Sequence, residues 1–475
     1  MAQNLPGCWV RVAILPLFAL ALGFLSSAVR AADLGGNCCA DLEERIAELE
    51  ATTARKGNRK VSLTISGYIN EAVMWFDAGD ESNIYQGTNE TARSRVRLAG
   101  DAKITGDWKA GYLMEFGLRS NRLNRDNQDV ANTRTNAFEL RHTAWWIDNK
   151  SLGRVWLGQT QQASDGVTEI TTANTSHFAR PSLSKFNGGF FLVTKSGVRT
   201  TNIWRDLESA DGVSGDNVAG EGDRRSLVRY DTPSIEGFKL SAAWGEDDFW
   251  DAGVRYAGEL AGFKLAGGIA YAQYTDDSNG LNLRGCAGLD PDGGISSQSD
   301  TSCHTLGLSA SIMHLATGLF VTGAWGRKTD DLRAERFAAA GVTKVAIDNK
   351  DDFWSLQAGI EQKFVSIGKT TLYGEYWRGT AGAQIGDTSG DPQSFQSVSD
   401  AAGLGFAAAR SAGSEASYWG AGLNQSIDAA ALDLYIGYRH YEGSADLFDA
   451  SGAGKSATVE FQDVDIVMSG AKISF

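Results

Sequence analysis

The last twelve residues, Val464-Asp-Ile-Val-Met-Ser-Gly-Ala-Lys-Ile-Ser-Phe475, decide the fold. They have the composition of a β-strand, with Ile473 and Phe475 on one face and Gly470 five residues before the end. A strand that ends on Phe475 without a polar tail would leave an edge that is prone to aggregation. Pairing with the first strand would remove this edge by closing the sheet. We therefore expect the chain to close its last strand on its first.

The composition favours an all-β chain. The 475 residues include 56 glycines, 6 prolines and 10% aromatic residues, and the mean hydropathy is −0.24. After the amino terminus, no apolar run reaches the roughly 20 residues that a membrane helix needs. This balance fits many short strands, either in a soluble β-protein or in a membrane barrel, whose strands each carry one apolar face.

The amino terminus has the features of a secretory signal. Arg11 precedes the apolar run 12–25, and Val29-Arg30-Ala31 offers small residues near a cleavage point, so residues 1–31 are predicted to be removed. Removal takes away two arginines and no acid, which changes the formal charge from −14 to −16. Such an acidic chain is a poor candidate for binding nucleic acid.

The cysteines suggest an oxidising compartment. Cys8 would leave with the signal, whereas Cys286 and Cys303 bracket a Gly/Asp/Ser-rich segment and are predicted to form a disulfide. Cys38 and Cys39 are adjacent, and neighbouring cysteines rarely bridge each other. They are expected to pair between subunits or to stay free, and a metal site is disfavoured because no histidine is near them in sequence.

One convincing helix is predicted, over 41–55 within the amino-terminal segment 32–59. Leu42, Ile46 and Leu49 recur at helical spacing, and Gly57 is placed to stop the helix. A lone helix of this length is marginal in water. It would either self-associate as a short coil beneath an oligomer or pack on its own barrel.

From Val61 onward the apolar period changes to two, which indicates strands. In 62–70, Leu63, Ile65 and Ile69 share one face, and in 93–98 three arginines alternate with Val96 and Leu98. In a soluble sandwich the apolar face would form the core, whereas in a membrane barrel it would face lipid. Arginine and glutamate on the polar faces suit a water-filled lumen.

The connections alternate in length. Tight turns are predicted at 105–107, 149–153, 233–237, 260–262, 316–318, 365–368 and 426–430. Between them lie longer polar stretches, broadly 77–91, 120–134, 161–224, 275–303, 329–350, 380–414 and 443–458, with a shorter loop near 246–249. Short turns at one rim and long loops at the other are typical of an antiparallel transmembrane barrel. The count predicts about sixteen strands across residues 60–475.

Tryptophans fall mostly near the predicted strand ends, as expected at a membrane interface, although some could instead fill a core or a subunit contact. They are Trp75, Trp108, Trp145, Trp146, Trp156, Trp244, Trp250, Trp325, Trp354, Trp377 and Trp419.

The junction from helix to first strand resembles a known family. The stretch 38–67, which begins Cys38-Cys39-Ala40-Asp41-Leu42-Glu43-Glu44 and ends Val61-Ser62-Leu63-Thr64-Ile65-Ser66-Gly67, resembles the start of mature alphaproteobacterial (rhizobial-type) general porins. The residues Gly470, Ile473 and Phe475 are also similar to the carboxy-terminal signal recognised by the outer-membrane assembly machinery. The resemblance implies a homotrimeric sixteen-stranded barrel in the bacterial outer membrane, in contact with lipid and lipopolysaccharide, that passes small hydrophilic solutes by diffusion.

The resemblance also implies that a long loop folds inward and narrows the lumen. The longest loop, 161–224, is the candidate, and its acids Asp165, Glu169, Asp206, Glu208, Asp211, Asp216, Glu221 and Asp223 would face a basic wall of Arg93, Arg95, Arg97, Arg119, Arg141 and Arg229. Facing rows of opposite charge would orient dipolar solutes in a narrow passage. Alternatively, the arginines only pair with loop carboxylates and pin the loop. The excess of acid weakly suggests a preference for cations.

Catalysis finds no support in the sequence. Gly-x-Ser-x-Gly and His-Glu-x-x-His motifs are absent, and no cofactor or metal is expected. The lone Gly420 and Gly422 pattern indicates strand packing rather than phosphate binding. Three function classes remain: a general porin, which leads, a substrate-specific channel, and a structural surface protein or adhesin with a plugged barrel.

Overall fold

The last strand closes on the first, as the sequence predicts. In the computed structural model, β20 (Val464–Ser474) lies between β18 (Leu432–Asp449) and β1 (Thr64–Asp77) and is antiparallel to both. The backbone of the terminal residue completes the seam: Gly67 N donates to Phe475 O at 2.9 Å, and Phe475 N donates to Gly67 O at 3.0 Å.

The structure describes residues 60–131, 138–208, 218–245, 248–275, 302–339, 342, 346–383, 395–452 and 454–475. The predicted signal 1–31, the predicted helix 41–55, Cys38, Cys39, Cys286, Asp211 and Asp216 lie outside these ranges.

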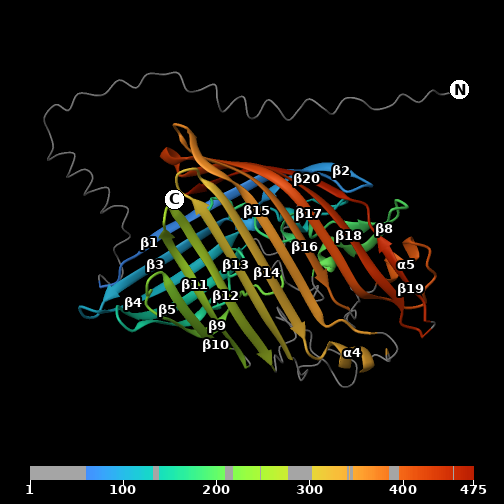
Figure 1. Ribbon diagram of the computed structural model, residues 1–475, viewed down its shortest axis with the longest axis horizontal. Helices are drawn as coiled ribbons and strands as arrows, with labels where there is room; N and C mark the ends of the chain where they lie inside the picture. Colours follow the sequence, from blue (N-terminus) through green and yellow to red (C-terminus); the bar gives the residue numbers. More distant parts are fainter. Residues whose placement is uncertain are drawn as a thin grey trace. The chain divides into compact units, whose positions relative to one another are not determined.

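Sixteen antiparallel strands close into a ring. Figure 1 shows these strands from the side, where they lie tilted next to one another. Two short strands of the same sheet, β2 (Ser82–Thr88) and β19 (Ser456–Glu460), extend hairpins at its edge. Besides β1, β18 and β20, the ring consists of β3 (Arg95–Lys103), β4 (Trp108–Leu118), β5 (Phe138–Asn149), β6 (Gly153–Gln161), β9 (Arg224–Asp231), β10 (Phe238–Gly245), β11 (Phe249–Leu260), β12 (Phe263–Thr275), β13 (Ser302–His314), β14 (Leu319–Asp330), β15 (Lys350–Val365), β16 (Gly368–Ala381) and β17 (Ala409–Ile427).

The predicted alternation of short and long connections is confirmed. All seven predicted tight turns join neighbouring strands, and the long stretches join the strands at the opposite end. The long connections carry short elements: η1 (Glu90–Ala92), η2 (Leu123–Arg125), α3 (Ser184–Asn187), β7 (Phe191–Val193), β8 (Arg199–Ile203), η3 (Trp204–Leu207), α4 (Arg333–Ala339) and α5 (Gln396–Ala401); η4 (Asp428–Ala430) is in a tight turn. Within the described ranges, no helix has the length and apolarity to cross a membrane.

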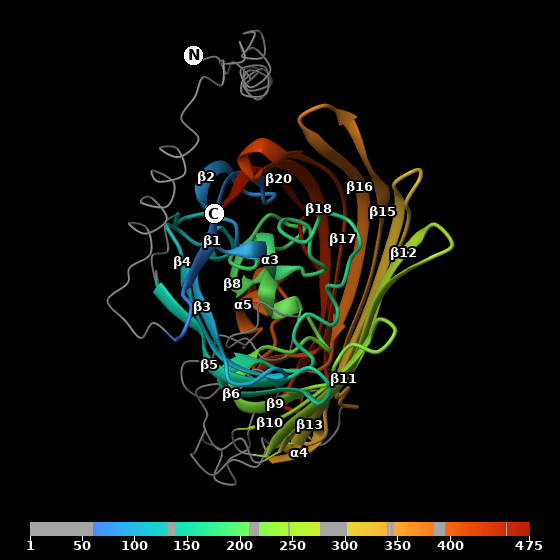
Figure 2. The ribbon, with the colours of Figure 1, turned by 90° about the vertical axis from the view of Figure 1, so that its left-hand side faces the viewer.

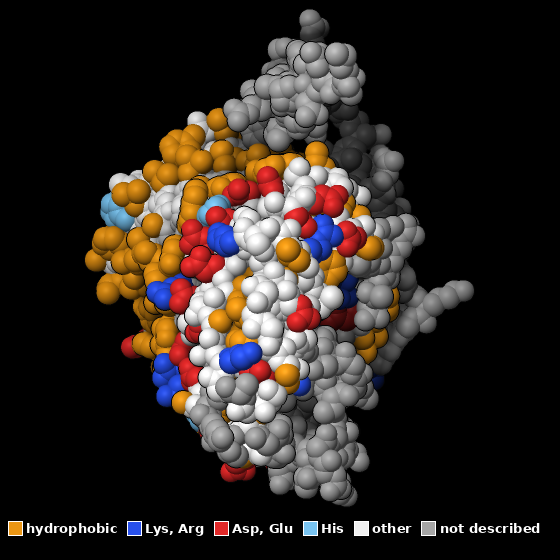
Figure 3. Space-filling view, turned by 90° about the vertical axis from the view of Figure 1, so that its right-hand side faces the viewer, with side chains coloured by type: hydrophobic (Ala, Val, Ile, Leu, Met, Phe, Trp, Pro, Cys, Tyr) orange, Lys and Arg blue, Asp and Glu red, His pale blue; other side chains and the backbone are white. Residues whose placement is uncertain are grey.

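Figure 3 shows the molecule from the side where β19 and α5 lie. Acidic and basic side chains are interspersed there with uncharged polar ones, while hydrophobic side chains gather at one flank. This mixture is what solvent-exposed loops beside an apolar barrel wall are expected to present.

Alternate residues of each strand face opposite sides of the ring. In β1, Ile65 is 57% exposed, whereas Met74 and Phe76 are fully buried. The tryptophans divide in the same way. Exposed ones suit a membrane interface, but Trp146, Trp156 and Trp377 are buried, so the expectation that the tryptophans mostly mark the interface is wrong for these three. The exposed ones are Trp108, Trp145, Trp244, Trp250, Trp354 and Trp419.

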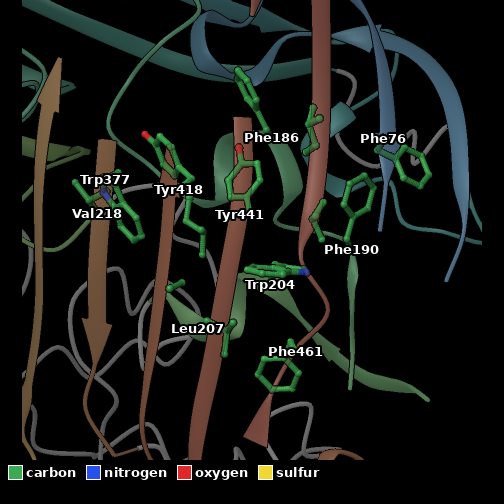
Figure 4. Packing of buried hydrophobic residues seen from close by; sticks show 14 of the residues in the cluster. Phe76, Phe186, Phe190, Trp204, Leu207, Val218, Trp377, Tyr418, Tyr441 and Phe461 are labelled. Carbon is green, nitrogen blue, oxygen red and sulfur yellow. The ribbon is translucent and has the colours of Figure 1, made fainter. Parts of the chain in front are cut away.

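The loop between β6 and β9 has a hydrophobic core that it shares with the barrel wall. Figure 2 looks into the ring and shows α3 and β8 of this loop within it. In Figure 4, Trp204 and Leu207 of the loop lie near Tyr441, and Tyr418 stands beside Trp377. The core joins loop residues to β1, β15–β18 and β20, so this loop fills one side of the ring. Its loop members include Phe178, Leu183, Phe186, Phe190, Leu192, Trp204 and Leu207.

Candidate functional site

Three arginines converge on one buried glutamate. Glu115 of β4 is fully buried, and its carboxylate accepts hydrogen bonds from Arg95 at 3.1 Å, Arg97 at 2.8 Å and Arg141 at 2.7 Å. The strand register explains the first two contacts, because Arg97 of β3 is directly opposite Glu115. Arg141 reaches the same carboxylate from β5, on the other side of β4.

A second group lies next to the first. Arg119 donates to Glu90 at 2.9 Å and to Glu139 at 2.7 Å, and Arg93 pairs with the same two acids. The structure therefore brings together five of the six predicted basic residues. Their partners are Glu90 in the β1–β3 connection, Glu115 in β4 and Glu139 in β5, and none of these acids belongs to the loop 161–224.

Arg229 is separate from these five. It pairs with Asp231 at 3.1 Å, donates to the backbone of Gln161 at 2.6 Å and lies over the ring of Trp156, 5.4 Å from its centroid. The alternation of β9 places it on the inner wall, but nearer to the short turns. Sequence reasoning grouped it with the others because the level of a residue along a tilted strand is not visible without the register.

The long loop is hydrogen-bonded to the wall opposite the arginines. Thr172 N donates to Ser311 at 3.0 Å, Thr175 Oγ1 donates to Gln357 at 2.7 Å, and Asn174 N donates to Glu361 at 2.7 Å. Further along, His177 contacts Asn424 at 3.2 Å. The loop thus contacts β13, β15 and β17 in turn.

The predicted loop acids have different environments. Glu169 forms an ion pair with Arg180 of the same loop, and Asp165 is near Arg224. Glu221 accepts hydrogen bonds from Thr168 N at 2.8 Å and from Gly166 N, which ties the two ends of the loop together. Burial raises the pKa of Asp165 and of Glu221. Asp223 lies beside Arg224 at 3.2 Å.

Asp206 and Glu208 differ from the expectation that they would present charge to a passage. Asp206 accepts from Ile203 N at 3.0 Å, and Glu208 accepts from Leu183 N at 2.9 Å and Ser184 N at 3.0 Å. Both carboxylates are buried, and burial raises the pKa of Asp206 to about 6 and also raises that of Glu208. The physical reason is that the folded loop needs acceptors for its own backbone N–H groups.

A buried ion pair fastens the loop to the wall. Arg439 of β18 is 1% exposed; it pairs with Glu375 of β16 at 2.8 Å and donates to the carbonyls of Arg180 at 3.0 Å and Ser182 at 3.2 Å. Gly420 of β17 lies between the two charges, and a Cβ there would approach Arg439 Cγ at 3.0 Å. We name Arg439, Glu375 and these two carbonyls the loop latch. Its partners are far apart in sequence, so pattern reasoning did not identify it.

Beneath the arginines, toward the short turns, the inner wall of β3–β6 borders a cavity of about 730 Å³. Its lining includes Arg97, which joins it to the arginine group, as well as Trp146 and Trp156. This cavity therefore lies on the arginine side of the inner wall.

Two further sequence predictions concern covalent and metal chemistry. Cys303 is buried and disulfide-bonded, while its predicted partner Cys286 is outside the described residues, so the pairing of these two stays a prediction. In the described part of the chain, no group of three or more histidine, cysteine or acidic side chains could hold a metal ion.

Comparison with known proteins identifies the family. The family described as Gram-negative porin matches residues 17–446. One similar solved structure is an anion-selective porin from Comamonas acidovorans, with 15% identity and a TM-score of 0.49, covering 87% of this chain and 100% of that chain. A second is OmpT, an outer membrane protein of Vibrio cholerae, with 11% identity and a TM-score of 0.47, covering 88% of this chain and 99% of that chain. A third is OmpF of Salmonella typhi in complex with daunomycin, with 11% identity and a TM-score of 0.44, covering 88% of this chain and 98% of that chain. No curated protein matches the chain. The chain belongs to the Gram-negative porin family.

Proposed function

We propose that solutes pass along the arginine-bearing side of this barrel, with the loop 161–224 as the constriction. As a Gram-negative porin, the protein is an outer-membrane channel for the passive diffusion of small hydrophilic solutes and ions. Its family is one of channels rather than enzymes. The observation that carries the proposal is the asymmetry of the interior: a hydrophobic core on the side of β15–β20 and clustered arginines on the side of β3–β5.

The same asymmetry supports a preference for anions. The five clustered arginines share three glutamates, so positive charge is in excess on this wall. Charges in a narrow passage with low-dielectric walls act on solutes more strongly than exposed charges do. The whole-chain charge of −14 is therefore a poor guide, because selectivity depends on the groups that line the narrowest part.

A homotrimer is part of the proposal. Glu71 of β1 faces outward between Ile69 and Val73, which are exposed, and it accepts hydrogen bonds from Thr88 at 2.8 Å and Ser120 at 2.6 Å. A carboxylate on a lipid-facing strand surface is costly. A second copy of the chain over this surface would remove it from hydrocarbon, which argues that β1 and the β1–β3 connection contribute to a subunit contact.

Several finer assignments stay predictions. They are the rhizobial-type origin, cleavage after Ala31, contact with lipopolysaccharide, and recognition of Gly470, Ile473 and Phe475 by the assembly machinery. Sequence comparison tests the rhizobial-type origin, and amino-terminal sequencing of the mature protein tests the cleavage site. Co-purification tests the contact with lipopolysaccharide. Assembly of a variant that lacks Phe475 tests the recognition by the assembly machinery.

Single-channel recording in a planar bilayer tests the proposed function. Unheated, detergent-extracted protein should give large ohmic conductance in steps of three. In a salt gradient, the sign of the reversal potential should show that anions permeate more readily than cations. A small conductance blocked by one solute would favour the substrate-specific channel. Absence of conductance from folded protein would refute the channel, and a cation-side reversal potential would refute the arginine-wall assignment.

A further inference from the structure

Near the short turns, the strand register sets two layers of residues side by side on the inner wall, and the cavity lies against the β3–β6 part of these layers. One layer runs Asp101, Gly111, Trp146, Trp156 and Arg229 across β3, β4, β5, β6 and β9. The layer nearer the turns runs Lys103, Lys109, Asp148, Arg154 and Asp231 across the same strands. Trp146 and Trp156 therefore lie next to Asp148 and Arg154 on the inner wall, one layer farther from the turns.

Arg154, in the layer nearer the turns, lies against the two tryptophans of the other layer. Its guanidinium lies 4.0 Å from the centroid of the Trp146 ring and 5.3 Å from that of Trp156, and its Nε donates to Asp148 at 3.0 Å. Gly111 makes room for this arrangement, because a Cβ there would collide with the Trp146 indole. A planar guanidinium stacked on two indoles loses little further freedom when it binds an anion.

The hydrogen-bonding capacity of Arg154 is only partly used. Among the described residues, its two Nη groups have no hydrogen-bond partner, and Lys103 Nζ on the same lining has neither a hydrogen bond nor an ion pair. Five basic and three acidic side chains line the cavity, so its charge is positive. The basic ones are Arg97, Lys103, Lys109, Lys150 and Arg154, and the acidic ones are Asp101, Asp107 and Asp148.

We propose that this cavity is a binding site for small carboxylates with an aromatic or other apolar body, occupied as the solute leaves the arginine group. A carboxylate matches the two Nη groups of a guanidinium in a planar, bidentate geometry. The half-buried Tyr112 and Leu113, together with the small exposed parts of Trp146 and Trp156 (9% each), form the apolar part of the lining, which the rest of the solute would contact. The volume of about 730 Å³ is in the range of small-molecule sites. This inference rests on the proposed diffusion path, which it deepens by naming a solute class.

The position suggests a weak, transient site. The cavity opens among residues of the tight turns, such as Gly106 and Lys150, at the end that faces the periplasm in outer-membrane barrels. Several of its ion pairs are solvent-exposed, as between Lys109 and Asp101 at 3.3 Å, and exposed pairs contribute little. A site that must both bind and release a diffusing solute needs this modest affinity.

Benzoate is the probe, with acetate as the carboxylate that lacks an apolar body. In single-channel recordings in potassium chloride, benzoate is added to each side in turn. It should reduce the current, and this block should reach a limit as the benzoate concentration rises. Acetate should reduce the current only at much higher concentration. Arg154→Gln should raise the half-blocking benzoate concentration about tenfold, the loss expected for one bidentate charge-assisted contact.

Two further variants control the experiment. Arg154→Lys keeps the charge but not the stacked planar group, so it should lose the preference for benzoate over acetate. Lys363→Gln removes a cation paired with Asp428 at 3.7 Å beside another tight turn, away from the cavity, and should behave as wild type. The folding of each variant is checked by comparing its gel mobility with and without heating.

The outcomes separate this site from the proposed function. A conducting wild type that benzoate does not affect would overturn the site and leave the channel intact. Equal block of wild type and Arg154→Gln would overturn it as well, by showing that Arg154 takes no part. A folded wild type that conducts no current would instead refute the proposed function, and with it the site.

Discussion

Burial of Asp206 should make folding stability depend on pH. The pKa of about 6 in the folded protein is above the roughly 3.9 of an exposed aspartate. The folded protein therefore binds this proton more tightly, so stability increases as the pH falls through 6 toward 4. The full effect is about 3 kcal/mol. Asp206→Asn keeps an acceptor for Ile203 N and removes the titration.

The measurement is the guanidinium midpoint of detergent-folded protein at several pH values, followed by tryptophan fluorescence. The wild-type midpoint should rise more on acidification than that of Asp206→Asn. Glu208 and Glu221 titrate in the same direction in both proteins, so only the difference between the two curves reports on Asp206. Parallel curves would contradict the assignment.

Glu115 should limit the anion preference of the wall. Its carboxylate is shared by Arg95, Arg97 and Arg141, so Glu115→Gln leaves three arginines with less compensation. We expect the reversal potential in a salt gradient to shift further to the anion side, with a several-fold change in permeability ratio.

Glu415→Gln is the matched control for Glu115→Gln. It also removes a carboxylate paired with an arginine, Arg378 at 2.7 Å, but this pair is exposed and on the outward-facing residues of β16 and β17. Its reversal potential should equal that of wild type. A shift of equal size in both variants would show that the lumen charge does not set the preference.

At the scale of elements, the loop latch should hold the constriction in place. Removing one partner of a buried ion pair costs roughly 3–5 kcal/mol, because the other charge stays buried without compensation. Glu375→Gln or Arg439→Met should therefore loosen the loop at Arg180 and Ser182. Single-channel traces should show larger mean conductance and more frequent current fluctuations than wild type.

The exposed pair Arg378 and Glu415 again gives a control on the same strands, because Arg378→Gln should leave the traces unchanged. Steady wild-type conductance in both latch variants would mean that the core around Phe178 and Trp204 holds the loop without help from the ion pair.

The sequence predicted elements well where the signal is local. Period-two alternation and turn composition identified the strands and all seven tight turns, because each depends on residues close together in the chain. The terminal strand was assigned to the seam because an unpaired apolar edge is unfavourable. The Gly420 and Gly422 pattern indicated strand packing, and both glycines lie under neighbouring side chains, Arg439 and Tyr373 respectively.

At the scale of the whole molecule, the interior could not be predicted to the same extent. Glu115 is recognisable as a partner of Arg97 only once the register of β3 and β4 is known. The loop latch joins Glu375 and Arg439, which are more than 60 positions apart in the chain. The hydrophobic core of the long loop likewise depends on which inward-facing residues of the strands the loop contacts. Buried Trp146, Trp156 and Trp377 carry the same sequence signal as tryptophans at the membrane interface.

The central claim is that the passage is one-sided, open along the arginine wall and closed where the loop packs. Arg97→Cys puts a thiol on the arginine wall, and Ser311→Cys puts one under the loop, where Ser311 bonds to Thr172 at 2.8 Å. A water-soluble anionic methanethiosulfonate is added during recording, with wild type as the baseline. Current should fall in Arg97→Cys and stay constant in Ser311→Cys. A fall only in Ser311→Cys, or in neither variant, would contradict the claim.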